Sequence, residues 1–391
     1  MFINEMTEDQ KWELIGRIEE QWRATDDPEF KAMVLACNQD VSEKAKLLHK
    51  ESIIIDACTF NVVRYGWRLQ EAKATALNCT VPGVFDGPGE AFKAIVGYYG
   101  VVNSDDRFRL ILSTDDIYRA KKQGQTGLII GAQSCGFVQS LEMEPYIQAF
   151  KRMGLRIMQI GYNFRTFAAD GCYSPANAGL SDTGMELIKL MEQYGITVDL
   201  SHAGERSTLE SLDMATKPQI FSHSNPKRLF DHPRNITDEQ AKKCASTDGV
   251  VGVTAYNVML WDGKTFPTIE TFLDCVEYFC DLIGVDHVGI GLDTTATEGC
   301  YPKDELMYFN KLVRKVSGEK SVTYQALMQN RKPPLGNAVE GLMCLANWVN
   351  LIEHMLKRGF SEEEIKKLIG ENWLRVFEKT WKPLNLEEER Y

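Results

Sequence analysis

Polar side chains of the kinds that bind metals or transfer protons follow several short apolar runs in this 391-residue chain. The residues at these run ends are Asp56, Cys58, Gln133, His202, His223 and Asp293. The chain has six histidines, and two of them occupy such positions, in "DLSH" and "FSHS". Imidazole nitrogens beside a carboxylate are a donor set that suits Zn²⁺. A metal site follows if the fold brings these run ends together.

The remaining histidines do not stand at such run ends. A lone histidine is more often an ordinary core or surface residue than a ligand. We interpret four histidines in this way: His49, His232, His287 and His354.

The apolar runs recur along the chain with helical segments between them, which predicts alternating strands and helices. The predicted strands are 53–57, 127–133, 156–163, 195–202, 218–224, 249–257 and 287–293, with a weaker eighth at 74–83. Eight such units predict an α/β fold, a single (β/α)8 TIM barrel, whose active site forms at the carboxyl ends of the strands. An open doubly wound sheet is the alternative. It is less favoured because no glycine-rich phosphate turn follows the first run.

Two segments lie outside the expected barrel core. Residues 7–50 have a helical pattern, with a capping Thr7 and apolar residues at helical spacing. We therefore predict an N-terminal helical extension over 1–50 and a barrel over 51–391. The polar segment 301–337 is predicted to be a long loop over one barrel mouth or a contact arm.

The composition limits the class of protein. The net charge is −11, and no basic cluster is present to hold phosphates, so nucleic-acid binding is not expected. No apolar stretch is long enough to span a bilayer, and the first residues do not resemble a signal peptide. Ten scattered cysteines without a CxxC pair then predict reduced thiols in a cytoplasmic protein.

Longer motifs around the run ends resemble the membrane (renal) dipeptidase family of zinc hydrolases, over about residues 50 to 381. "GITVDLSHAGERS" and "IFSHSNPKRLFDHPRNITDEQ" look like the strands that carry the family's two β-site histidines. "LIGVDHVGIGLD" is similar to the strand with the α-site aspartate, and "KRGFSEEEIKKLIGENWLRVFEKTW" to the closing helices.

The resemblance implies roles for individual residues. His202 and His223 would bind the β-zinc, Asp293 would bind the α-zinc, and Arg234 would grip the carboxylate of a small-molecule substrate. Tyr162 stands where the family usually has a substrate-side histidine. An active-site tyrosine is expected at Tyr256. A homodimer is also implied by the resemblance.

The first strand departs from the family pattern. The family has Asp-Gly-His-x-Asp there, whereas this chain has Asp56-Ala57-Cys58-Thr59-Phe60. Cys58 thus replaces the α-zinc histidine and Phe60 replaces an aspartate ligand. Gln133 takes the place of the glutamate that bridges both metals. Asp293 is then the one carboxylate left of three, too little charge for two adjacent dications.

We therefore expect one zinc ion at His202 and His223, with Gln133, Asp293, Cys58 or water as further ligands. Operation without metal, with Asp293 as the proton-transfer group, is the alternative. The expected activity is that of a dipeptidase-like metallo-hydrolase acting on a dipeptide or small amide that bears a carboxylate, with Asp293 as general base. The same barrel could instead serve a lyase, an isomerase or a transferase, or a non-catalytic binding protein. Cys58 could be a nucleophile, but a cysteine without a basic partner is more often inert.

Overall fold

A computed structural model describes residues 28–60, 67–262, 265, 267–295 and 338–382 of the chain. The predictions for residues 7–27 and for the segment 301–337 fall outside these described residues. No helix of the described part is long and apolar enough to cross a membrane.

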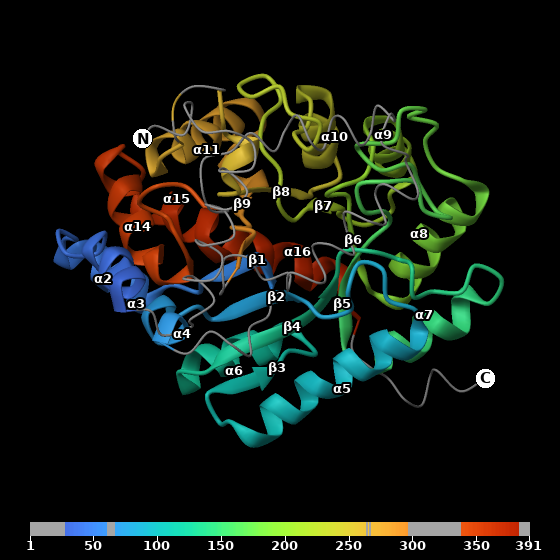
Figure 1. The fold of residues 1–391 in the computed structure, drawn as a ribbon, viewed down its shortest axis with the longest axis horizontal. Coiled ribbons are helices and arrows are strands. Elements are labelled where there is room, and N and C mark those ends of the chain that lie inside the picture. Colours follow the sequence, from blue (N-terminus) through green and yellow to red (C-terminus); the bar gives the residue numbers. More distant parts are fainter. Residues whose placement is uncertain (1–27, 61–66, 263–264, 266, 296–337, 383–391) are drawn as a thin grey trace, which may run out of the picture.

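Parallel strands form a closed ring (Figure 1). Their order is β1 (Ile55–Phe60), β2 (Ala76–Thr80), β4 (Thr126–Ala132), β5 (Leu155–Gln159), β6 (Thr197–Asp199), β7 (Ile220–Phe221), β8 (Val250–Val253) and β9 (Val288–Ile290). β9 pairs with β8, and the chain then continues into β10 (Thr294–Thr295), which pairs with β1. β9 itself also contacts β1, so the ring closes between the last and the first strand of the barrel. The predicted (β/α)8 barrel is confirmed, and the open sheet is excluded.

Most of the strands are shorter than the predicted runs, and short strands occur that were not predicted. A short strand, β3 (Phe108–Leu110), pairs with the start of β4 and was not predicted. The predicted run 195–202 is a strand only at Thr197–Asp199, because the chain turns away from the sheet at its polar end. His202, in that turn, has a φ of 69°.

Helices surround the ring. They are α4 (Trp67–Ala72), α5 (Pro88–Ser104), α6 (Thr114–Gln123), α7 (Met143–Arg152), α8 (Asp182–Tyr194), α9 (Glu205–Met214), α10 (Asp238–Ser246), α11 (Ile269–Ile283), α14 (Trp348–Lys357), α15 (Glu362–Lys366) and α16 (Asn372–Thr380). Helical cover explains the continuous apolar runs of the strands, which are buried on both faces.

Helix α16 closes the amino-terminal end of the barrel. Its Trp373 and Phe377 pack in one buried cluster with Ile129, Ile157 and Ile220 from three separate strands. Arg375 of the same helix donates to the backbone of Asp248 and Asp286, which precede β8 and β9. Figure 1 shows this helix crossing behind the ring of strands. The opposite end, at the carboxyl ends of the strands, remains for a site.

The described part of the N-terminal extension packs on the outside of the barrel. It consists of α2 (Pro28–Ala36) and α3 (Glu43–Glu51). Asn347 Nδ2 donates to the carbonyl oxygen of Val34 at 2.9 Å, and Ser42 Oγ donates to Glu353 Oε2 at 2.5 Å. These hydrogen bonds join the extension to α14 and the turn before it.

Candidate metal centre

The structure brings three of the predicted site residues together at the carboxyl end of the barrel. Cys58, His223 and Asp293 each offer a ligand atom, and these atoms lie within 4.8 Å of one another. Cys58 Sγ donates to Asp293 Oδ1 at 3.3 Å, and Gln133 Nε2 donates to Cys58 Sγ at 3.0 Å. β1, β4, β7 and β9 thus contribute one side chain each to a single cluster.

His202 joins this cluster through His223. The two Nε2 atoms lie 2.9 Å apart, and the ring centroids are separated by 4.9 Å. Both side chains are buried. The histidines that follow β6 and β7 therefore face each other through the same nitrogen.

Two of these residues have a strained backbone. His202 and Asp293 lie in the left-handed region, with φ of 69° and 54°. Non-glycine residues adopt that region at a cost of roughly 1–3 kcal/mol and keep it only where the surroundings impose it, commonly at functional sites. The turns that aim these two side chains at the cluster are thus costly local conformations.

A hydrogen bond at the far nitrogen fixes the orientation of each imidazole. His202 Nδ1 lies 2.7 Å from Asn163 Oδ1, which can only accept. His223 Nδ1 lies 2.7 Å from Ser222 Oγ. That hydroxyl gives its own proton to Asp199 Oδ2 at 2.5 Å, so it accepts from His223. Both Nδ1 atoms are therefore protonated in the neutral rings.

The consequence is that two Nε2 lone pairs face each other at 2.9 Å. Burial lowers the pKa of both histidines well below the ordinary value, and the nearby Arg234 guanidinium lowers it further. Neutral rings in this arrangement repel unless a cation sits between or beside them. Two such nitrogens next to a carboxylate and a thiol match the donor set of a zinc site, so these residues fit a metal ion.

Burial also governs the acidic members of the cluster. It raises the pKa of Asp293 to about 6, although Arg234 and the Cys58 hydrogen bond act in the opposite direction. Burial and the neighbouring Asp293 raise the pKa of the Cys58 thiol well above its ordinary value. Cys58 is accordingly a protonated donor to Asp293, which is the opposite of what an activated nucleophile requires.

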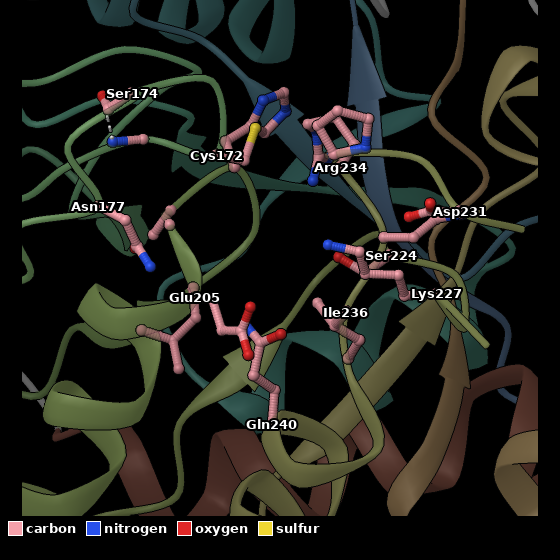
Figure 2. Close-up of a pocket in the computed structure, with 17 residues that line it drawn as sticks. Cys172, Ser174, Asn177, Glu205, Ser224, Lys227, Asp231, Arg234, Ile236 and Gln240 are labelled. Atoms are coloured by element: carbon pink, nitrogen blue, oxygen red, sulfur yellow. Dashed lines mark hydrogen bonds between the residues drawn. The ribbon is translucent and has the colours of Figure 1, made fainter.

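Arg234 borders a pocket of about 440 Å³ beside His202. Figure 2 shows Arg234, Cys172, Lys227 and Gln240 around this space. Arg234 is 6% exposed, and one terminal nitrogen donates to the carbonyl oxygen of His223 at 3.2 Å. It has no carboxylate partner among the described residues. A buried guanidinium that forms no ion pair within the described residues can bind an anionic ligand, and its charge also lowers the pKa of the nearby Asp293.

The two tyrosines take different positions. The ring of Tyr162 stacks on that of His202, with centroids 4.2 Å apart and an interplanar angle of 27°. Tyr256 follows β8 and is half-buried, and its backbone N–H donates to Thr254 Oγ1 at 3.2 Å. Tyr162 thus contacts a predicted metal ligand directly.

Three residues of the hydrogen-bond network around the two histidines were not predicted from the sequence: Asn163, Asp199 and Ser222. Each of them stands close to a predicted site residue: Ser222 directly precedes His223, Asp199 stands three positions before His202 in "DLSH", and Asn163 directly follows Tyr162. The contact of Asn163 with His202 depends on the turn after β5.

The model of the membrane dipeptidase family (peptidase family M19) matches residues 93–324. The chain is 25% identical over 273 residues to dipeptidase tcpJ of Claviceps purpurea. The aligned residues cover 69% of this chain and 55% of that protein. It is 28% identical over 302 residues to dipeptidase verJ of Clonostachys rogersoniana. That alignment covers 75% of this chain and 67% of verJ. The match thus spans little more than half of the length of tcpJ.

Solved structures give a consistent result. An amidohydrolase from Pseudomonas aeruginosa superposes with a TM-score of 0.76 at 31% identity, over 86% of this chain and 99% of that one. A metallopeptidase of Rhodobacter sphaeroides, bound to a phosphinate mimic of L-Ala-D-Ala, superposes with a TM-score of 0.67 at 17% identity. The superposition covers 85% of this chain and 100% of that one. At that identity the second likeness concerns the fold alone.

Proposed function

Because the chain belongs to the membrane dipeptidase family and is by family a metallo-hydrolase, we propose that it hydrolyses the amide bond of a dipeptide or another small amide bearing a carboxylate. We further propose that it uses one zinc ion rather than two. The observation that carries the proposal is the convergence of the His202 and His223 Nε2 atoms, 2.9 Å apart, beside Asp293.

His202 and His223 would hold the ion, and Asp293, Cys58 and Gln133 beside them would be further ligands of the metal. A bound zinc ion would polarise the scissile carbonyl group and make a water molecule more acidic. A second dication would find little compensation, because Cys58 and Phe60 occupy the positions of two family ligands and Gln133 is neutral. Asp293 would be the one carboxylate available to both ions.

Asp293 is the proposed general base. Its raised pKa, about 6, keeps it a stronger base than an exposed aspartate while leaving it largely ionised at neutral pH. Cys58 donates to Oδ1 alone, so the carboxylate keeps an oxygen for the proton of the attacking water. The same group would then return that proton to the leaving amine.

Arg234 is the proposed anchor for the substrate carboxylate. Its guanidinium offers a planar pair of donors, and no carboxylate of the described residues occupies it. The ring of Tyr162, stacked on His202, would contact the substrate between this anchor and the metal. Tyr256 is proposed as a further substrate contact from the end of β8.

The experiment combines metal analysis with an activity screen. The purified chain is dialysed against a weak chelator, its zinc content is measured, and a dipeptide panel is tested before and after removal of zinc. We expect about one equivalent of zinc and hydrolysis that zinc removal abolishes. Two equivalents would refute the single-ion proposal, and absence of hydrolysis across the panel would refute the activity.

One observation favours a second candidate. Asp293 accepts a hydrogen bond from the Cys58 thiol, and burial raises its pKa to about 6. Proton transfer by Asp293 without zinc, as in a lyase or isomerase, is therefore the alternative. A protein that retains no zinc and hydrolyses no dipeptide would direct the search to that class.

A further inference from the structure

We propose that Asp199 is a positioning residue, which acts through Ser222 to hold His223 in the tautomer that presents an unprotonated Nε2 to a metal ion. The inference rests on the metal site of the proposed function. It concerns Ser222 and Asp199, which would not touch the metal and to which the resemblance assigned no role.

Asp199 is a buried carboxylate with donors at every contact. Oδ1 accepts from the backbone N–H groups of Ser201 and Ser222, each at 3.0 Å. Oδ2 accepts from Gln159 Nε2 at 3.0 Å and from Ser222 Oγ at 2.5 Å. Four donors thus surround a carboxyl group that is 2% exposed, and each of its oxygens accepts two hydrogen bonds.

The direction of the next hydrogen bond follows from the single proton of a hydroxyl. Ser222 gives that proton to Asp199, so Ser222 Oγ can only accept from His223 Nδ1, 2.7 Å away. Ser201 Oγ, which accepts from the His223 N–H at 3.1 Å, lies 3.3 Å from Ser222 Oγ and can supply a further proton to it. The arrangement leaves no donor for His223 Nδ1, and the ring must carry its proton there.

The hydrogen-bonded residues around Asp199 lie inside the barrel, near the carboxyl ends of its strands. Gln159, Asp199 and Ser222 come from the ends of three neighbouring strands, β5, β6 and β7. Each stands two positions after a buried residue of its strand, so the pleat turns all three to the same face as those residues. Two of these earlier residues, Ile157 and Ile220, belong to the apolar cluster on α16. Gln159, Asp199 and Ser222 therefore form a polar layer between the apolar cluster on α16 and the proposed metal-binding histidines.

A simpler interpretation is that Asp199 only satisfies the backbone N–H groups of Ser201 and Ser222. Asp199→Asn separates the two interpretations, because Asn Oδ1 can still accept from both N–H groups. Its Nδ2 would donate to Ser222 Oγ and, once the Gln159 amide turns over, to Gln159 Oε1, a buried atom that now has no partner among the described residues. Ser222 would then donate to His223 Nδ1, and the ring would shift its proton to Nε2.

The test reads the tautomer directly in the metal-free, full-length protein labelled with ¹⁵N-histidine. Long-range ¹H–¹⁵N NMR should show the Nδ1–H form of His223 in the wild type and the Nε2–H form in Asp199→Asn. Zinc affinity, measured by chelator competition, should fall about tenfold or more in the variant. The melting temperature should change little, since every hydrogen bond can be remade.

Further variants separate an effect on the His223 tautomer from a general loss of stability. Ser222→Thr retains the hydroxyl and should retain both the tautomer and the affinity, whereas Ser222→Ala should lose the fixed tautomer. Thr197→Val is the matched control. It removes a buried hydroxyl from β6 that bonds to Thr380 and Trp381 instead, so it should lower the melting temperature alone.

An unchanged His223 tautomer in both Asp199→Asn and Ser222→Ala would overturn the proposal, as would a lower melting temperature with unchanged zinc affinity. The NMR measurement needs neither zinc nor substrate. A wild type that binds no zinc would therefore refute the proposed function, while the tautomers would still decide the role of Asp199.

Discussion

His202 and His223 turn the same nitrogen toward each other, with their Nε2 atoms 2.9 Å apart and their Nδ1 atoms each engaged elsewhere. Two neutral imidazoles held in this way expose lone pairs to each other in a buried place. The arrangement is unfavourable for the protein alone and favourable around a cation.

Replacing either histidine with alanine should abolish tight zinc binding, because one imidazole would remain where two converge. Elemental analysis after dialysis measures the bound zinc, with an expected change from about one equivalent to near zero. His287→Gln is the control, since His287 bonds through Nδ1 to the Gly249 carbonyl oxygen, before β8. Full zinc occupancy in both alanine variants would contradict the assignment.

Restoring the family ligands should increase the number of bound metals. The triple variant Cys58→His, Phe60→Asp and Gln133→Glu returns two carboxylates and an imidazole to the site, enough to neutralise a second dication. Zinc content should rise from about one equivalent toward two. Gln133→Glu alone is the matched control and should stay near one. An unchanged content in a folded triple variant would mean that the missing ligands do not limit the stoichiometry.

Arg234→Met should raise KM for a dipeptide by roughly tenfold to a hundredfold, because a hydrogen bond to a charged group contributes about 1.5–3 kcal/mol. Arg234→Lys should raise it less, since it keeps the charge but loses the planar pair of donors. Comparing each dipeptide with its C-terminal amide isolates the carboxylate contact. The wild type should prefer the free acid, and Arg234→Met should not distinguish the two.

Lys227→Met provides the control for that series, since Lys227 lines the same pocket but is only half-buried. It should preserve most of the preference for the free acid. If Arg234→Met keeps the wild-type preference, the carboxylate is bound elsewhere.

Acid should destabilise the protein through His49. Burial lowers the pKa of His49 from 6.5 to about 4, although the Nε2–H hydrogen bond to the Ala72 carbonyl oxygen opposes the shift. Between these values the unfolded chain binds a proton that the folded chain does not, so stability is complete above pH 6.5 and falls as the pH approaches 4. The loss amounts to about 3 kcal/mol for this group.

Urea unfolding at several pH values measures this loss. His49→Gln, whose amide can still donate to Ala72, should make the dependence between pH 6.5 and 4 less steep, while the other buried histidines keep their share of it. His287→Gln leaves His49 in place and should keep the slope. Parallel curves for the wild type and His49→Gln would exclude His49 as the cause.

The order of residues along the chain was enough to predict the class of fold and to propose the main donors. Apolar runs such as 127–133 and 249–257 alternate with helical segments, and that local pattern reflects burial on both faces of a parallel sheet. Once the runs are strands of a barrel, a residue at a run end, such as His202 or His223, must lie at one mouth. The short strand β3 left no such signal, because its three residues are too few to show a period.

The tertiary structure alone decided how the donors are oriented. Chain sequence cannot say which nitrogen of His223 carries the proton, since that depends on Ser222, Asp199 and Gln159 from three strands meeting inside the barrel. It also cannot show that Asn163 fixes His202 from 39 positions away. Residue types follow from the sequence, whereas hydrogen-bond direction and pKa depend on burial and distance, which exist only after the strands have closed into a ring.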